Sequence, residues 1–270
     1  MQRAYTFRRY GTHTITNAMI EISSIYKRFE EQTVLNNISA LFDDGKTNLI
    51  IGKSGAGKTV LLKCIVGLLT PEKGKIIYDG RDIVSFNKKE MMLLRREIGM
   101  LFQNAALFDS MSVLENVMFP LDMFSDMPYK ERVKRAQFCL DRVSMLEAQD
   151  KSPDELSGGM QKRAAIARAI ALGPKYLFCD EPNSGLDPQT SLKIDELIHD
   201  ITKEYNITTI VNTHDMNSVM GIGDHILFLA DGRLSWEGNK DEILYTDNET
   251  LNNFLFSSDL VRKVKEMGNK

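Results

Sequence analysis

Residues 52–59 read Gly52-Lys53-Ser54-Gly55-Ala56-Gly57-Lys58-Thr59 and match the pattern G-x-x-x-x-G-K-[ST]. They follow the apolar run Thr47–Ile51 and open a helical pattern over Lys58–Gly67, the setting that a phosphate-binding loop requires. Glycine lets the backbone curl so that successive N–H groups point at phosphate oxygens, and the helix start adds partial positive charge. We predict that this loop binds nucleotide phosphates, with the Lys58 ammonium at the β- and γ-phosphates and the Thr59 hydroxyl on Mg²⁺.

Apolar runs that predict strands alternate with helical patterns around this loop. The predicted strands are Ile20–Ser24, Ile38–Phe42, Thr47–Ile51, Gly74–Tyr78, Ile98–Phe102, Tyr176–Cys179, Thr208–Asn212 and His225–Leu229. Residues 104–155 have few β-branched runs and predict an inserted helical subdomain. The alternation indicates an α/β fold with a mostly parallel sheet that helices cover on both faces.

Two of these strands end in polar side chains. Asp180 and Glu181 follow the apolar residues of Tyr176–Cys179, and His214 follows Thr208–Asn212. Ligands of open α/β sheets bind outside the carboxyl ends of the strands, so these side chains are expected beside the phosphate loop. We predict that Asp180 holds Mg²⁺ and that Glu181 orients and deprotonates the attacking water. His214 is expected to donate to the γ-phosphate.

A second candidate anion site reads Leu156-Ser157-Gly158-Gly159-Met160-Gln161. Ser157 suits a helix N-cap, and the predicted helix runs to about Leu172 before Gly173-Pro174. Glycines in its first turn leave N–H groups open at the positive end of the helix. One nucleotide needs one phosphate loop, so a second anion-binding helix start indicates a second copy of the chain.

Composition excludes several other classes of protein. The 270 residues carry 34 Lys and Arg against 37 Asp and Glu, a net charge of −3, so we expect no nucleic-acid partner. The three cysteines are far apart in the sequence, which argues against a disulfide scaffold or a cysteine-rich zinc site. No apolar run approaches the roughly 18 to 20 residues that span a bilayer, so another chain must supply any membrane span.

Over about residues 20–240 the sequence resembles the nucleotide-binding subunits of ATP-binding cassette (ABC) transporters. The resemblance implies a P-loop NTPase with a RecA-like sheet, an N-terminal antiparallel β subdomain and an inserted helical subdomain. It implies ATP hydrolysis with Mg²⁺ by a homodimer that sits on integral membrane permease subunits. Met160 replaces the usual glutamine of the signature, a change that removes no backbone donor.

The resemblance also assigns roles to individual residues. Phe29 is similar to the aromatic residue that stacks on adenine, and Gln103 to the glutamine that joins Mg²⁺ to the helical subdomain. Residues implied to contact nucleotide are Phe29, Gly52, Ser54, Gly55, Ala56, Gly57, Lys58, Thr59, Ser157, Gly158, Gly159 and Asp187. Those implied to act in catalysis are Glu181, His214 and Gln103, and those implied to hold the metal are Thr59, Gln103 and Asp180.

Three segments narrow the family. The signature form above, the run 181–188 (EPNSGLDP) and the run 213–220 (THDMNSVM) are similar to ATPases of MCE-type phospholipid transport systems. This implies phospholipid transport across the bacterial envelope, an MCE-type substrate-binding partner and a peripheral position on the cytoplasmic face of the inner membrane. The alternatives are an ATPase that serves an importer of amino acids or another small solute, and a soluble cassette protein without a membrane partner.

The sequence divides into residues 1–18, a cassette domain over 19–247 and a helical tail over 248–270. Residues 1–18 are either a tail or precede a true start at Met19. Methionine and phenylalanine gather around Gln103, where they either pack the core of the helical subdomain or form a partner surface. We predict that some of residues 106–118 line a groove for a short helix of a membrane subunit.

Overall fold

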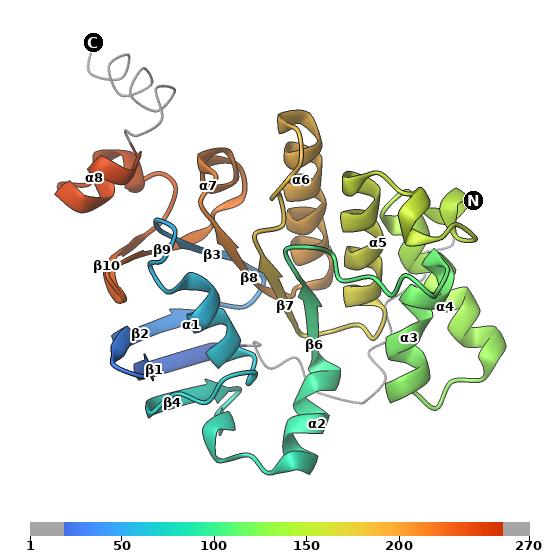
Figure 1. Ribbon diagram of the computed structural model, residues 1–270, viewed down its shortest axis with the longest axis horizontal. Coiled ribbons are helices and arrows are strands. Elements are labelled where there is room, and N and C mark those ends of the chain that lie inside the picture. The colour runs from blue at the N-terminus through green and yellow to red at the C-terminus, as the bar shows by residue number, and fades with distance from the viewer. Residues whose placement is uncertain (1–18, 256–270) are drawn as a thin grey trace.

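Two sheets make up the framework of the computed structural model, which describes residues 19–255 (Figure 1). The smaller sheet is antiparallel, in the order β2-β1-β4-β5, with strands β1 (Ile20–Phe29), β2 (Gln32–Phe42), β4 (Lys73–Tyr78) and β5 (Arg81–Asp82). The larger sheet has the order β10-β9-β3-β8-β7-β6. Its strands are β3 (Thr47–Ile51), β6 (Ile98–Leu101), β7 (Tyr176–Asp180), β8 (Thr208–Thr213), β9 (His225–Ala230) and β10 (Arg233–Gly238).

The larger sheet is parallel except at the edge strand β10, which pairs antiparallel with β9. Alternate residues of its inner strands enter two different cores because successive side chains point to opposite faces. Leu49 and Ile51 of β3 join one core with α3 to α8, whereas Ile50 joins the other with α1 and the antiparallel sheet. Burial on both faces explains why β3 and β7 read as continuous apolar runs.

The helices divide between these two cores. They are α1 (Lys58–Ile65), α2 (Lys88–Glu97), α3 (Val113–Phe124), α4 (Tyr129–Arg142), α5 (Gly158–Ile170), α6 (Pro188–Tyr205), α7 (Met216–Ile222) and α8 (Glu249–Leu255). In Figure 1, α3, α4 and α5 gather beside β6, and α1 lies between the two sheets. Within residues 19–255, none of the helices has the length and apolar character needed to cross a membrane.

The predicted strands and the two predicted helices are confirmed, with shifted ends. β1 and β2 are longer than expected because β1 continues past an irregularity at Ser24, whose φ is 51°. The helix predicted from Lys58 ends at Ile65, and the one after Ser157 ends at Ile170. The edge strand β10 was not expected, since its residues alternate between exposed and half-buried with few apolar side chains.

The segment 104–155 departs from its helical prediction at its start. Helices α3 and α4 and the short 3₁₀ turns Leu146–Ala148 and Pro153–Glu155 lie in it, but residues 102–112 form no helix. Ala105 and Ala106 have φ of 58° and 51°, which right-handed helix excludes. The buried Asn116 amide holds the loop by donating to the carbonyl oxygens of Phe108, Met111 and Ser112.

The structure describes only part of the two terminal segments that the sequence analysis set apart from the cassette domain. Residues 1–18, for which a tail or an alternative start was predicted, lie outside the described residues, as do residues 256–270 of the predicted C-terminal helical tail. The described part of that tail is α8, whose Leu251, Phe254 and Leu255 are buried in the same core as β3. The ring centroids of Phe254 and Phe228 lie 5.4 Å apart, so α8 packs on the larger sheet.

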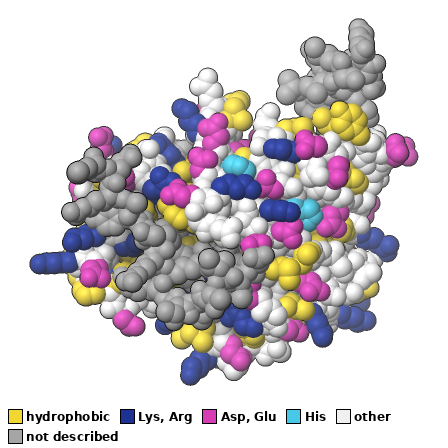
Figure 2. All heavy atoms as spheres, turned by 180° about the vertical axis from the view of Figure 1, so that it is seen from behind, with side chains coloured by type: hydrophobic (Ala, Val, Ile, Leu, Met, Phe, Trp, Pro, Cys, Tyr) yellow, Lys and Arg dark blue, Asp and Glu magenta, His cyan; other side chains and the backbone are white. Residues whose placement is uncertain are grey.

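Charge is spread over the surface without a broad field of one sign on the face that Figure 2 shows. Basic and acidic side chains of the described residues intermingle there with scattered apolar ones. The residues of 19–255 that are visible on this face therefore form no extended basic surface of the kind that binds a phosphate backbone.

Candidate functional site

The phosphate loop connects β3 to α1 in the structure. Gly52, Gly55 and Gly57 all have positive φ, of 151°, 82° and 98°. A Cβ at Gly52 would lie 2.4 Å from the carbonyl oxygen of Leu229, so this position excludes any side chain. The loop lets the N–H groups at the start of α1 face an anion beyond the end of β3. Ser54 in this loop is exposed, whereas Ala56 is buried.

Lys58 lies inside this loop with only 8% of its surface exposed. Its Nζ donates to the carbonyl oxygen of Gly52 at 2.9 Å and to that of Lys53 at 3.4 Å. The same Nζ lies 3.6 Å from Glu181 Oε1. The ammonium thus lies among two carbonyl oxygens and one carboxylate at the mouth of the loop, where it can form charge-assisted hydrogen bonds to phosphate oxygens.

Oxygen ligands suited to Mg²⁺ gather where α1 meets β7. Thr59 Oγ1 donates to Asp180 Oδ1 at 3.1 Å, and Asn212 Nδ2 of β8 donates to the same oxygen at 3.0 Å. The buried Asn212 Oδ1 has no hydrogen-bond partner in the described structure. Mg²⁺ prefers one or two protein oxygens together with phosphate oxygens and water, so these residues fit the ion.

The other two predicted polar groups meet at the same edge. β7 and β8 are parallel neighbours, with Asp180 opposite Asn212, so the residues that follow them come together. His214 Nδ1 lies 2.8 Å from Glu181 Oε2. The His214 side chain is 65% exposed and that of Glu181 is 15% exposed, so the imidazole can reach a bound ligand. Glu181 has φ of 49°, a sharp turn directly after the strand.

Gln103 follows β6 at the same edge as Thr59 and Asp180. Its Nε2 donates to Ser184 Oγ at 3.2 Å. This contact places Gln103 on the turn that follows Glu181. The role of Gln103 as a metal ligand stays a prediction.

Phe29 lies at the end of β1, where it pairs with Gln32 of β2. Its ring is exposed, and Lys27 Nζ lies 5.2 Å from the ring centroid. β2 approaches the phosphate loop, since a Cβ on Gly57 would lie 2.9 Å from Leu35. An exposed ring on the hairpin beside the loop is available for stacking on a base.

Sequence reasoning missed Lys162 of α5. Its side chain is buried, and its Nζ contacts the carbonyl oxygens of Gln103 and Glu181. Burial lowers the pKa of Lys162. The signal was a lysine on the buried stripe of a helix, at the spacing Gly159, Lys162, Ile166.

Asn212 was also missed, since an amide inside a strand is not by itself a sign of metal binding.

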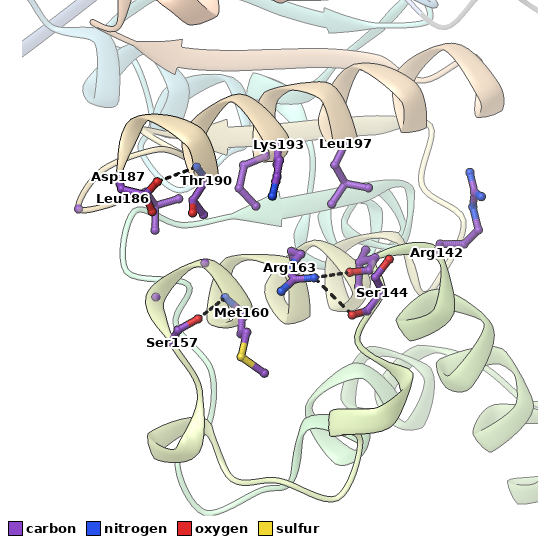
Figure 3. A pocket seen from close by; sticks show the side chains of 15 residues that line it. Arg142, Ser144, Ser157, Met160, Arg163, Leu186, Asp187, Thr190, Lys193 and Leu197 are labelled. Carbon is purple, nitrogen blue, oxygen red and sulfur yellow. Dashed lines mark hydrogen bonds between the residues drawn. The ribbon is translucent and has the colours of Figure 1, made fainter.

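The second anion site lies on a different part of the chain. Ser157 Oγ accepts from the Met160 N–H at 3.3 Å and caps α5, as predicted for an N-cap. Figure 3 shows side chains of α5 and α6 facing each other across a pocket of about 470 Å³. Gly159 must stay small, because a Cβ there would lie 2.6 Å from Thr190 Cγ2.

Asp187 belongs to this signature pocket, which is lined by Ser157, Gly158, Gly159, Arg163, Asp187, Thr190 and Lys193 among others. Its carboxylate accepts from the backbone N–H groups of Gln189 and Thr190 and caps α6. Hydrogen bonds from Thr190 and Gln189 lower the pKa of Asp187. The lining contains no residue of 52–59 and neither Glu181 nor His214, so the two predicted anion sites lie apart on the chain.

Comparisons with known proteins agree with this arrangement. The family model described as ABC transporter matches residues 35–184. The intermembrane phospholipid transport system ATP-binding protein MlaF of Haemophilus influenzae is 37% identical over 237 residues, which cover 88% of this chain and 90% of that protein. The methionine import ATP-binding protein MetN of the same species is 40% identical over 229 residues, 83% of this chain and 66% of that protein.

A solved structure shows the fold in dimeric form. It is the ATP-binding cassette MJ0796 in a post-hydrolysis state bound to ADP and Pi, with a TM-score of 0.75 and 32% identity. The match covers 82% of this chain and 98% of that one.

Replacing Lys58 by alanine should weaken ATP binding by about 10- to 100-fold, since a charge-assisted contact to phosphate contributes about 1.5–3 kcal/mol. Calorimetric titration with Mg-ATP measures this loss. The matched control is Lys53→Ala, which removes an exposed lysine from the same loop and should leave affinity within about two-fold of wild type. Normal ATP affinity in Lys58→Ala would contradict the assignment.

Replacing Glu181 by glutamine should preserve ATP binding but reduce steady-state hydrolysis by at least about 100-fold, because the amide cannot accept the proton of the attacking water. Phosphate release measures turnover, and gel filtration with ATP should show the variant trapped as a closed dimer. Glu196→Gln, an exposed carboxylate on α6, serves as control. Full turnover by Glu181→Gln would remove Glu181 from the role.

Proposed function

The chain belongs to the ABC transporter family as an ATP-hydrolysing cassette, and from that premise we propose that it powers phospholipid transport across the bacterial envelope. Cassettes of this family bind ATP with Mg²⁺, form dimers and work with membrane permeases. The observation that carries the proposal is the 37% identity to the phospholipid transport ATPase MlaF over 88% of this chain.

Hydrolysis follows from the groups at the sheet edge. The Lys58 ammonium binds β- and γ-phosphate oxygens, and Thr59 and Asp180 are positioned to hold Mg²⁺, which draws charge from the phosphates. A water oxygen attacks the γ-phosphorus while its proton passes to the Glu181 carboxylate. The bond from the γ-phosphorus to the bridging oxygen breaks, and ADP leaves. His214, within 2.8 Å of Glu181, donates to the γ-phosphate oxygens.

Two copies of the chain complete each site. The N–H groups of Gly158 and Gly159 and the Ser157 hydroxyl offer a second set of donors at the start of α5. In a head-to-tail pair they meet the γ-phosphate on the phosphate loop of the other copy. Hydrolysis removes this bridge, so the closed dimer is favoured only while ATP is intact.

A membrane subunit docks in an apolar groove of about 530 Å³ between β6 and α3. The groove is lined mostly by large apolar side chains, among them Leu68, Met100, Phe102, Phe108, Phe119 and Phe124. Phe102 directly precedes Gln103, so the groove and the nucleotide edge share one segment. Of the predicted range 106–118, Ala106 and Phe108 line the groove, whereas Val113, Val117 and Met118 are buried in the core.

The phospholipid assignment rests on the signature form LSGGM, on the runs EPNSGLDP and THDMNSVM, and on the similarity to MlaF. It carries with it a peripheral position on the cytoplasmic face of the inner membrane and an MCE-type substrate-binding partner. A second candidate, an amino-acid importer, is favoured by the 40% identity to MetN.

Purification of the tagged chain from detergent-extracted membranes, with mass spectrometry of bound proteins and lipids, separates these candidates. We expect a polytopic permease, an MCE-type protein and phospholipid. A permease accompanied by a soluble amino-acid-binding protein, with ATPase activity stimulated by an amino acid, would replace the phospholipid assignment. Recovery without any membrane protein would contradict the transporter assignment.

A polar side chain in the groove should uncouple transport from hydrolysis. Phe108→Ser removes an exposed ring of the groove that packs on Phe119 at 4.7 Å, and we expect at least a ten-fold loss of permease binding at near-normal basal ATPase activity. Co-purification with the permease and phosphate release measure the two quantities. Met123→Ser, a change of an exposed residue on α3 outside the groove lining, is the control. Normal permease binding by Phe108→Ser would exclude the groove as docking site.

A further inference from the structure

A buried carboxylate outside the nucleotide edge lies on α6. Asp195 is 3% exposed and forms no ion pair with the lysine, arginine or histidine side chains of residues 19–255. Its Oδ1 accepts from Asn183 Nδ2 at 2.8 Å, and its Oδ2 accepts from Ser218 Oγ at 2.8 Å. Asn183 Nδ2 also donates to Ser218 Oγ at 3.1 Å.

The two partners of Asp195 belong to the two segments that carry the reactive side chains. Asn183 lies in the turn after Glu181, a turn closed by the hydrogen bond from the Ser184 N–H to the Glu181 carbonyl oxygen. Ser218 lies in α7, which Asp215 caps directly after His214. One carboxylate therefore ties the Glu181 turn to the helix that follows His214.

The burial of the Asp195 carboxylate lowers the stability of the folded protein. Burying a carboxylate without a cation costs several kcal/mol, and an apolar residue such as the neighbouring Ile194 or Ile198 would pack there at lower cost. The cost is offset only in part, because the buried Asn183 Oδ1 has no hydrogen-bond partner. The carboxylate does, however, fix the position of the Glu181 turn relative to α7 through its two hydrogen bonds.

We propose that Asp195 is a positioning residue for ATP hydrolysis, which holds the Glu181 turn and the His214 segment in register through Asn183 and Ser218. The proposal rests on the proposed roles of Glu181 and His214. Asp195 does not touch nucleotide, so its effect falls on the chemical step and not on ATP affinity.

The protonation of Asp195 adds a pH dependence that can be measured. Burial raises the pKa of Asp195 to about 6, with a smaller upward contribution from the carboxylates of Asp215 and Glu196 and an opposing one from the hydrogen bonds of Ser218 and Asn183. The Cys179 thiol of β7 also faces this carboxylate. The folded state thus holds the proton more tightly than the unfolded state, so the contribution of Asp195 to stability falls as pH rises from about 4 through 6.

The ionised carboxylate accepts both hydrogen bonds, whereas the protonated form must donate one. The Asn183 amide has an acceptor without a partner, its Oδ1, and this atom can accept from Asp195 only after the amide turns over. We therefore expect an acid limb near pH 6 in kcat that belongs to Asp195.

Steady-state kinetics of the full chain test the proposal with Asp195→Leu and Asp195→Asn. Asp195→Leu should lower kcat by about 10- to 100-fold with KM for ATP within about two-fold, because Glu181 and His214 lose their alignment. Asp195→Asn mimics the protonated carboxyl at every pH, so its kcat should lie between those of wild type and Asp195→Leu, and the acid limb near pH 6 should be lost. Thr202→Val removes a buried hydroxyl of the same helix whose hydrogen bonds go to Ile198 and Thr209, so it controls for stability.

The outcomes separate two kinds of failure. Turnover by Glu181→Gln would overturn the proposed roles and the Asp195 proposal with them. If Glu181→Gln stalls while folded Asp195→Leu keeps the wild-type kcat, or changes kcat no more than Thr202→Val, only the positioning proposal is wrong. An acid limb that persists in Asp195→Asn would also contradict it.

Discussion

The negative charge of a nucleoside triphosphate needs hydrogen-bond donors around it. In this chain the predicted donors lie at two helix starts that are far apart in the sequence. The start of α1 and Lys58 form one set, and the start of α5 with Ser157 forms the other, in a pocket that shares no residue with the phosphate loop. Backbone N–H groups at a helix start act only over short distances, so neither set can serve for the other. In the cycle proposed above, ATP links two copies of the chain, and its hydrolysis removes the link.

The parallel sheet brings together the residues around the phosphate loop. Because β3, β6, β7 and β8 run in the same direction, their carboxyl ends deliver the phosphate loop, Gln103, Asp180 with Glu181, and His214 to one edge. Further contacts connect this edge to α5 and to the apolar groove. Lys162 joins α5 to the carbonyl oxygens of Gln103 and Glu181, so the signature helix and the nucleotide edge are mechanically connected. Phe102 and Phe108 extend the same segment into the apolar groove.

Local pattern was sufficient for all strands except β5 and β10, and for Asp180, Glu181 and His214, which each follow a predicted strand. Capping signals also exposed the start of α5, and the same kind of signal, Asn87 with Glu90, marks α2, which was not predicted. The non-helical loop at 102–112 and the contacts of Lys162, Asn212 and Asp195 depend on segments far apart in sequence. No periodicity encodes such contacts.

The most direct test of the divided site is the ATPase rate per chain as a function of protein concentration, with pairing followed in parallel by light scattering. If each site needs donors from a second copy, the rate per chain should rise with concentration and level off where dimers predominate. Dilution to monomers should then abolish hydrolysis while single-site ATP binding persists. An unchanged rate per chain in samples that are strictly monomeric would contradict the divided site and remove the basis for a cycle driven by dimer closure.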